Sequence, residues 1–402
     1  MEQTNYIILR STKPVDLGDP FTGFATRSLS AAIENTSLRI DVESLRKGDI
    51  ADLRRDPEVV NIAPSMPTML IAPTASDDVE KPNLTGSTWG VIATGADKSP
   101  FTGKGVTVAV LDTGIDANHE AFQGVNVVQK DFTDEGDGDK QGHGTHCAGT
   151  IFGQVINGYR FSVAPGISKA LIGKVLNSQG GGSTEQIYRG IVWALDQGAN
   201  VISMSLGMNF PGLVKRLVER GVPADLATSQ ALEAYRANVR LFDSLASLTR
   251  ARSNLFQPTL VIAAAGNESQ RRVNPNYELA VAPPASADGF VSVGALQTPG
   301  EPNDALTVAS FSNTGPNISA PGVDIYSAKT QGGYVSKSGT SMATPHVAGI
   351  AALWMEKLLT ENKMINVMEL SSRLIGRATK AKLAAGFDPM DVGVGLAQAP
   401  LE

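Results

Sequence analysis

The sequence contains very little cysteine and no cluster of basic residues. Cys147 is the single cysteine among 402 residues, so no intramolecular disulfide can form and an oxidising compartment is not indicated. The 34 Lys and Arg residues are outnumbered by 40 Asp and Glu residues, and the formal charge is -6. Because no positive stripe can follow a phosphate backbone, nucleic acid is not expected as a partner.

Long hydrophobic runs are also missing. No stretch approaches the roughly 20 apolar residues that span a bilayer, so no membrane segment is expected. The first ten residues, MEQTNYIILR, lack the basic start, the long apolar stretch and the small-residue cleavage site of a signal peptide. We therefore expect a cytoplasmic protein, although a leader removed beforehand would leave the same pattern and would imply secretion.

Hydrophobic residues nevertheless make up 42% of the chain, which is ample for a large core. Residues 1–75 read as a small α+β domain, in which residues 5–10, 37–42 and 59–62 favour strands and residues 29–33 and 42–55 favour helices. The stretch 64–87 carries Pro, Thr, Ser and Asp without sustained periodicity. We expect a linker there, with the domain boundary at residues 76–88.

The remainder, residues 89–402, alternates buried strands with helices. Short apolar and β-branched runs occupy residues 106–111, 169–175, 201–204 and 260–264, and a helical pattern covers residues 184–197. This alternation predicts an α/β domain, with an open, mainly parallel sheet and helices on both faces.

Reactive side chains stand among glycines and small residues in several segments. In VAVLDTGID, Asp112 follows a buried strand, at the edge where open α/β sheets build their sites. Aspartates at that edge also bind metals, accept phosphate or cap the next helix. In HGTHCAGT, His143 and His146 offer imidazoles, whose pKa suits a general base for a hydroxyl. A metal-binding pair is the alternative, but the segment has no acidic third ligand and no HExxH pattern.

Two further segments complete the set. In SGTSMATPHVAG, Ser341 begins an apolar helical run, where the helix dipole and free N–H groups favour developing negative charge. An ordinary helix cap is the alternative, although Gly339, Ala343 and Ala348 clear space for a substrate and for close packing. In VIAAAGNES, Asn267 follows a strand, and its amide can donate a hydrogen bond to an oxyanion.

Together the four segments resemble the signature regions of the subtilisin-like (S8) peptidase family, in that family's order of Asp, His and Ser. The resemblance extends from Trp89 to Leu396 and includes VAP at 163–165, VISMSLG at 201–207, SAPGVDIYS at 319–327 and GVGL at 393–396. It implies a subtilisin-like fold and a serine endopeptidase.

The resemblance also implies the role of each catalytic residue. Ser341 is the nucleophile, His143 is the general base and then the acid, and Asp112 holds the imidazole in its tautomer. Asn267 and the backbone N–H of Ser341 form the oxyanion hole.

Protein or peptide substrates are expected, by the same resemblance, to bind as an added strand between two groups of residues. One group is Gly180, Gly181 and Gly182, and the other is Ser205, Leu206 and Gly207. The S1 pocket, which takes the residue before the cut bond, would be lined by Ala264, Ala265, Gly266 and Ala282, with Glu268 at its rim. Recognition of main chain predicts broad specificity, with an apolar residue in S1.

The sequence departs from the family at two places. Ala121 stands where many members carry an acidic ligand of a tight calcium site, so we expect that site to be absent and no cofactor to be required. The acidic loop with Asp134, Asp137 and Asp139 is expected to be a solvated turn, and weak binding of calcium is the alternative. Amphipathic stretches at 213–220 and 225–252 predict a helical insertion at about 209–258.

Residues 1–75 resemble the inhibitory prosegments of the family in their β-prone start at 6–9 and in DPEVVNIAP at 56–64. This implies a zymogen whose own N-terminal prosegment inhibits in cis and is removed by autocatalytic cleavage. The cut is expected near Leu70 to Ala72, within the range 69–78. An unrelated, permanently attached domain is the alternative.

The remaining histidines and the cysteine have expected places as well. His146 and His346 match positions that are not catalytic in the family, so we expect packed side chains. Cys147 lies where some members carry a thiol behind the general base. Two other functions stay open: a catalytically silent, peptide-binding scaffold, and a metallohydrolase that uses His143, His146 and nearby aspartates.

Overall fold

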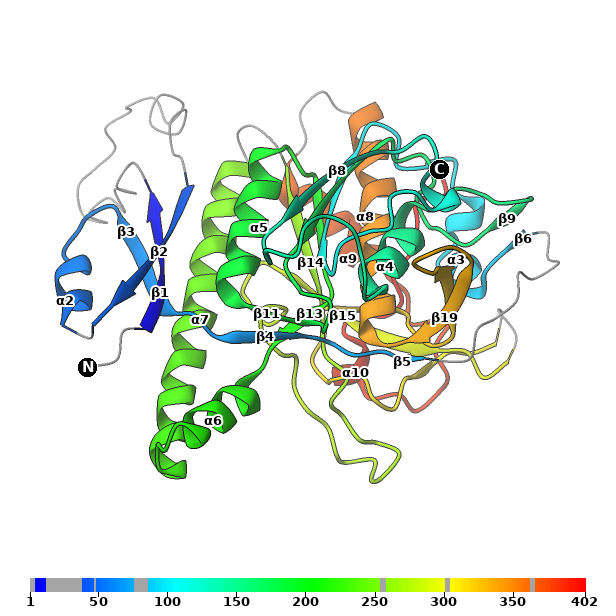
Figure 1. Cartoon of the computed structure of the whole chain (residues 1–402). Helices are drawn as coiled ribbons and strands as arrows, with labels where there is room; N and C mark the ends of the chain where they lie inside the picture. Colours follow the sequence, from blue (N-terminus) through cyan, green and yellow to red (C-terminus); the bar gives the residue numbers. More distant parts are fainter. Residues whose placement is uncertain are drawn as a thin grey trace, which may run out of the picture.

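The computed structural model describes residues 4–11, 38–46, 48–75, 86–253, 258–300, 304–361 and 366–402. It contains a small N-terminal sheet and a large α/β domain, which lie side by side (Figure 1). The helix predicted at residues 29–33 lies outside the described residues.

The N-terminal unit is an antiparallel sheet in the order β2-β1-β3, with the short helix α2 beside it. Its elements are β1 (Thr4–Ser11), β2 (Leu38–Leu45), α2 (Asp49–Leu53) and β3 (Val59–Pro64). Alternation along β1 separates two faces: Ile7 and Leu9 join the core shared with the large domain, whereas Ile8 packs among residues of the unit itself. The three predicted strands are confirmed.

The helix predicted over residues 42–55 was wrong for most of its length. Strand β2 continues to Leu45, and only five residues of the range are helical. Val42 pairs with Ile7 in β1, and the hydrogen bonds and burial gained in that sheet outweigh the local helix propensity.

The large domain is built on a mainly parallel sheet, as predicted. Its strand order is β16-β15-β14-β12-β7-β10-β8, and β17 also pairs with β15. The strands are β7 (Thr107–Asp112), β8 (Asn126–Asp131), β10 (Lys169–Lys174), β12 (Val201–Met204), β14 (Leu260–Ala264), β15 (Val291–Gln297), β16 (Thr307–Val308) and β17 (Ile318–Pro321). Among these pairings, only β15–β16 is antiparallel.

Helices cover both faces of this sheet because its strands are apolar on both sides. Val108 and Val110 of β7 join the core that contains α4 (His143–Phe152) and α8 (Thr340–Glu361). Ala109 and Leu111 of the same strand join the opposite core, with α5 (Thr184–Asp196) and α7 (Ala224–Ser253). Such two-sided burial is typical of parallel sheets.

The other elements are short or lie at the periphery. They are α3 (Trp89–Ala93), η1 (Ala96–Lys98), η2 (Glu120–Phe122), β9 (Tyr159–Arg160), β11 (Gly181–Ser183), β13 (Leu206–Met208), α6 (Phe210–Glu219), β18 (Ile325–Ala328), β19 (Tyr334–Ser338), α9 (Val367–Gly376) and α10 (Pro389–Val392). Within the described ranges, every helix is too short or too polar to cross a bilayer.

The amphipathic stretches predicted at 213–220 and 225–252 are helical, and they belong to α6 and α7 of the proposed insertion. Asn209 caps the start of α6, where its side chain accepts a hydrogen bond from the backbone of Gly212. Phe210 then packs edge-on against Tyr235 of α7, with ring centroids 5.9 Å apart. The long helix α7 also contacts β3 of the N-terminal unit, so the insertion adjoins that unit.

The stretch 64–87 was predicted to lack regular structure, and this was wrong. It contains β4 (Pro67–Leu70), β5 (Thr74–Ala75) and β6 (Gly86–Ser87). Strand β4 lies between β11 and β13 and is antiparallel to both (Figure 1), and β5 pairs with β19. These strands have no periodicity to reveal them, because their hydrogen-bond partners come from distant parts of the chain. Residues 76–85 of the expected linker lie outside the described part.

Candidate active site

Asp112 is the last residue of β7, and it is fully buried. Its backbone carbonyl accepts hydrogen bonds from the N–H groups of Val175 and Leu176, which follow β10. Its carboxylate accepts the backbone N–H of Thr113 at 2.7 Å. The end of the sheet therefore fixes this side chain in one position.

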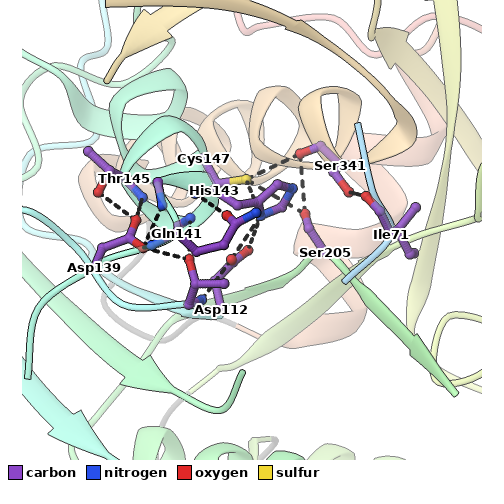
Figure 2. A network of polar contacts seen from close by, with 12 residues as sticks. Ile71, Asp112, Asp139, Gln141, His143, Thr145, Cys147, Ser205 and Ser341 are labelled. Carbon is purple, nitrogen blue, oxygen red and sulfur yellow. Dashed lines mark hydrogen bonds and ion pairs between the residues drawn. The ribbon is translucent and has the colours of Figure 1, made fainter. Parts of the chain in front are cut away.

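His143, the first residue of α4, lies directly against that carboxylate (Figure 2). Its Nδ1 is 2.8 Å from Oδ1 and 2.9 Å from Oδ2 of Asp112. A carboxylate only accepts, so Nδ1 carries the proton and Nε2 is the basic nitrogen. Nε2 is buried and has no hydrogen-bond partner among the described residues.

Ser341 is the second residue of α8, and it is also buried. Its hydroxyl donates a hydrogen bond to the carbonyl oxygen of Ile71 at 3.0 Å, as Figure 2 shows. Its own carbonyl accepts the hydroxyl of Ser205 at 3.2 Å and the thiol of Cys147 at 3.4 Å. The structure thus brings the three predicted triad residues to the same end of the sheet.

Asn267 lies in the loop after β14, and Thr340 fixes the orientation of its amide. Oδ1 of Asn267 accepts the backbone N–H of Thr340 at 2.8 Å and its hydroxyl at 2.9 Å. With Oδ1 occupied in this way, Nδ2 points to the carbonyl oxygen of Ala72 at 3.1 Å. A Cβ at Gly339 would lie 2.9 Å from Nδ2, so only glycine leaves room for this donor.

Asp139 joins the loop after Asp112 to the start of α4. Its carboxylate accepts from the hydroxyl of Thr113, from the N–H groups of Gln141 and Gly142, and from both the N–H and the hydroxyl of Thr145. Burial alone would raise the pKa of Asp139, but these hydrogen bonds together outweigh it and lower the pKa. The solvated turn expected here was wrong for this residue.

The predicted substrate-binding residues surround the segment that contains β4. Gly181 and Gly207 lie opposite Met69 on its two sides, and Leu206 lies opposite Leu70. The carbonyl of Gly180 accepts the N–H of Leu70 at 2.7 Å. Gly182 is required sterically, because a Cβ there would lie 2.5 Å from the carbonyl oxygen of Val175. Ser205 contacts the same site through its bond to Ser341.

The residues predicted for the S1 pocket lie around the loop after β14. Ala264 ends that strand, and the carbonyl of Ala265 accepts the N–H of Ala282 at 3.1 Å. Gly266 has a φ of +116°, and a Cβ there would lie 2.2 Å from Nδ2 of Asn313. The side chain of Ile71, which is 2% exposed, lies close to Gly207, one of the predicted substrate-binding residues.

Sequence reasoning missed Asn313, which holds this loop together. Its Nδ2 donates to Oε2 of Glu268 at 2.7 Å and to the carbonyl of Ala265 at 3.2 Å. Its Oδ1 accepts the backbone N–H groups of Glu268 and Ser269. The surrounding sequence FSNTGP reads as an ordinary turn, so no local signal indicates this role.

His146 and His346 are packed, as expected. Nε2 of His146 lies 2.9 Å from the carbonyl of Ile325, and burial lowers the pKa of His146 well below its ordinary value. Nδ1 of His346 lies 2.8 Å from the carbonyl of Met342, and burial lowers its pKa to about 4. Because His146 faces backbone carbonyls, it does not complete a metal site with His143.

Asp112, His143 and Cys147 form the one group of three metal-capable side chains found in the described part of the chain. Sγ of Cys147 lies 3.7 Å from Nδ1 of His143, so the thiol is behind the imidazole, as expected. The pairing of Nδ1 with Asp112 gives this cluster the geometry of a catalytic dyad with an adjacent thiol.

Ala121 is completely buried. Its N–H donates to Nδ1 of His119 at 3.0 Å, and its carbonyl accepts the N–H of Gln154. Protein groups thus take both of its main-chain hydrogen bonds, and its side chain offers no oxygen to a cation.

We predict that Asp139→Asn reduces the free energy of unfolding at pH 7 by about 1 to 3 kcal/mol, because a hydrogen-bonded carboxylate is replaced by a weaker acceptor. A folded-state pKa below the ordinary 3.8 stabilises the fold above that pH, and the contribution is lost as the pH falls through the lowered pKa. Urea unfolding of both proteins at several pH values measures this. A difference that grows as the pH falls below about 4 would contradict the assignment.

We also predict that excess EDTA lowers the melting temperature only slightly, because Ala121 replaces the acidic calcium ligand. A tight site would stabilise the fold by mass action and would show a large drop on chelation. Differential scanning calorimetry with and without EDTA measures the effect. A fall of about ten degrees or more would show that a tight cation site exists.

Comparison with known proteins identifies the family of this chain. The profile of the subtilase family (peptidase S8) matches residues 103–389. Subtilisin DY of Bacillus licheniformis is 33% identical over 282 residues, which cover 69% of this chain and 85% of that protein. An intracellular serine protease of Paenibacillus polymyxa is 36% identical over 304 residues, covering 73% and 79%. Alkaline serine exoprotease A of Vibrio alginolyticus is 32% identical over 357 residues, covering 85% and 55%. The chain therefore belongs to the subtilase family and is a serine endopeptidase.

Proposed function

We propose that Ser341, His143, Asp112 and Asn267 carry out the hydrolysis of peptide bonds. The observation that carries this proposal is the buried imidazole, whose Nδ1 is held by Asp112 at 2.8 Å while Nε2 stays available to accept a proton. Oγ of Ser341 attacks the substrate carbonyl carbon, and its proton passes to Nε2. The Asp112 carboxylate stabilises the imidazolium that forms.

The same groups complete the reaction. Nε2 returns the proton to the leaving nitrogen as the C–N bond breaks, which leaves an acyl group on Ser341. Water then attacks the acyl carbon and gives a proton to His143, and the serine hydroxyl is restored. The amide of Asn267 and the backbone N–H of Ser341 donate to the oxyanion, a contribution of roughly 3 to 4 kcal/mol in enzymes of this kind.

We further propose that the chain is made as an autoinhibited precursor, with residues 66–75 in the substrate cleft. Two successive carbonyls of this segment engage the catalytic donors separately: Ile71 accepts the hydroxyl of Ser341, and Ala72 accepts the amide of Asn267. Cleavage requires the nucleophile and the oxyanion donors to act on a single carbonyl. The hydroxyl proton is also directed to Ile71 rather than to His143. The segment therefore binds as an inhibitor.

The N-terminal unit holds this segment in place through α7. Asn238 donates from Nδ2 to the carbonyl of Pro64 at 2.8 Å, and Asn61 donates to the hydroxyl of Ser244 at 3.1 Å. Asn238 is completely buried, so its bond to Pro64 is shielded from water. A segment tethered in this way occupies the cleft at an effective concentration that is independent of protein concentration.

Removal of the prosegment by cleavage within residues 69–78 then yields the active enzyme. Ser341 of this protein performs the cut once the segment shifts so that the nucleophile and the oxyanion donors meet at a single carbonyl. Ile71 in the cleft supports a preference for an apolar residue before the cut bond. Cytoplasmic location, and weak binding of calcium by Asp134 and Asp137, stay predictions. A permanently attached domain and a catalytically silent scaffold are the alternatives that the following experiments address.

We predict that a fluorophosphonate probe labels Ser341 of the processed protein, because the probe reports an activated serine. Ser341→Ala should not be labelled, and EDTA should have no effect, since the proposed reaction uses no metal. Mass spectrometry of the labelled peptide identifies the site. A processed wild-type protein that resists the probe would favour the silent scaffold, and labelling that EDTA abolishes would favour metal-dependent chemistry.

We predict that p-chloromercuribenzoate inhibits the processed enzyme slowly. Burial raises the pKa of the Cys147 thiol well above its ordinary value, so little reactive thiolate is present. Once formed, the bulky adduct should displace His143, whose Nδ1 lies 3.7 Å from Sγ. Cys147→Ser is the matched control and should resist the reagent. Full activity of a wild-type enzyme in which modification of Cys147 is verified would contradict this placement.

We predict that Thr68→Val slows activation of the precursor about tenfold. Thr68 is 3% exposed, and its hydroxyl oxygen has no hydrogen-bond partner in the described part of the structure. A buried unpaired hydroxyl costs about 1 to 3 kcal/mol, so valine of similar shape should hold the segment more tightly. Thr68→Ser, which keeps the hydroxyl, is the control. Time courses of processing on denaturing gels measure the rates, and faster processing of Thr68→Val would refute this reasoning.

A further inference from the structure

Two hydrogen bonds hold the segment beyond the N-terminal end of β4. The backbone N–H of Met66 donates to the hydroxyl oxygen of Thr184 at 3.0 Å. The carbonyl of Met66 accepts the backbone N–H of Thr184 at 2.9 Å. Thr184 is completely buried at the start of α5. One residue of the catalytic domain therefore satisfies both main-chain groups of Met66.

A third hydrogen bond reaches the segment from its other side. The carbonyl of Pro67 accepts the backbone N–H of Asn209 at 2.9 Å. The cap of α6 fixes Asn209, because Oδ1 of Asn209 accepts the N–H of Gly212 at 2.8 Å. The helical insertion begins at this point, so its first turn supplies one wall of the cleft.

The position of Thr184 is equally well fixed. The preceding residue, Ser183, forms a capping box with Gln186, in which each side chain accepts the backbone N–H of the other residue. Two helix starts, those of α5 and α6, thus offer rigid main-chain donors on opposite sides of the segment. Such donors need no rearrangement to bind an extended peptide.

We propose that Thr184 and Asn209 form two additional substrate subsites, for the fifth and sixth residues before the cut bond. The inference rests on the proposed function, in which residues 66–71 occupy the place of a substrate. With Ile71 in S1, Pro67 is the fifth residue and Met66 the sixth. The preferred substrates are then unstructured polypeptides that can present at least six extended residues.

The main chain, rather than the side chain of the sixth residue, provides most of this recognition. The side chain of Met66 is 1% exposed and packs in one cluster with Ile187 and Tyr188 of α5, but also with Ile7 and Leu9 of the N-terminal unit. A substrate lacks those last two residues. The bonds to Thr184 and Asn209 remain, because both residues belong to the catalytic domain.

A series of peptides tests the inference on the active enzyme that the full-length chain yields. The peptides carry the chain's own residues before a fluorogenic leaving group, begin at Met69, Thr68, Pro67, Met66 or Ser65, and are acetylated, so that the acetyl carbonyl takes the place of the carbonyl of the preceding residue. Hydrogen bonds of this kind contribute about 0.5 to 1.5 kcal/mol each. We expect kcat/KM to rise about threefold to tenfold for each added residue as far as Met66, and no further for Ser65.

A double-mutant cycle isolates the contact with Thr184. Thr184→Val removes the hydroxyl acceptor, and a peptide with oxygen in place of the Met66 nitrogen removes the donor. Each change alone should reduce kcat/KM for the six-residue peptide about threefold to tenfold, and the two together should reduce it no further. Thr184→Ser keeps the hydroxyl acceptor, so its kcat/KM for the six-residue peptide should equal that of the wild type. The matched control Thr360→Val should also behave as the wild type, since Thr360 is exposed at the end of α8.

The outcomes separate this inference from the proposed function. Equal kcat/KM for the four-residue and six-residue peptides, or additive losses in the cycle, would overturn the Thr184 subsite. Equal kcat/KM for the three-residue and four-residue peptides would overturn the Asn209 subsite, and either result leaves the serine peptidase intact. If no peptide is cleaved and Ser341 is not labelled, the proposed function fails, and hydrogen exchange of full-length Ser341→Ala decides the contact. Faster exchange of the Met66 amide in Thr184→Val supports the contact with Thr184 on which the subsite is based, and unchanged exchange overturns both the contact and the subsite.

Discussion

The hydrogen bond from the hydroxyl of Ser341 to the carbonyl of Ile71 connects the two parts of this molecule. On one side of it stand the sheet, the buried dyad of Asp112 and His143, and the start of α8. On the other side are strand β4, which pairs with β11 and β13 of the cleft, and the N-terminal unit that holds this strand. In the proposed mechanism the same hydroxyl transfers its proton to His143, so this hydrogen bond is incompatible with catalysis for as long as Ile71 occupies the site.

The fold supplies this site with groups that need little reorganisation. Asp112 and Asn267 follow parallel strands at one edge of the sheet, and His143 and Ser341 begin helices that cover one face of it. Asp139 joins two of these elements through buried hydrogen bonds, and Thr340 fixes the amide of Asn267. In a water-excluded site, donors and acceptors fixed in this way stabilise developing charge more strongly than mobile ones. The cleft then binds main chain through β11 and β13, which explains why any extended segment, including the protein's own, can enter it.

Much of the fold and the catalytic residues could be predicted from sequence, and the failures share one cause. The buried strands β7, β12 and β14 are rich in apolar and β-branched residues, so the local sequence pattern is sufficient to predict them. Asp112, His143, Ser341 and Asn267 each stand in a segment of distinctive small residues. The strand β4, by contrast, owes its structure to Gly181 and Gly207, more than a hundred positions away. The same holds for Val42, whose pairing with Ile7 replaced the expected helix, and for Asn313, which reads as a turn residue but holds the S1 loop. In each of these cases the structure depends on contacts with residues far away in the sequence, which the local sequence pattern does not reveal.

We propose that residues 66–75 inhibit the enzyme in cis until Ser341 of this protein removes the prosegment. Intact-mass measurement and N-terminal sequencing of the purified wild-type protein beside Ser341→Ala test this proposal. We expect the wild-type protein to acquire a new N-terminus within residues 69–78, whereas Ser341→Ala keeps its full length. The same new N-terminus in Ser341→Ala, produced without any other protease, would contradict it.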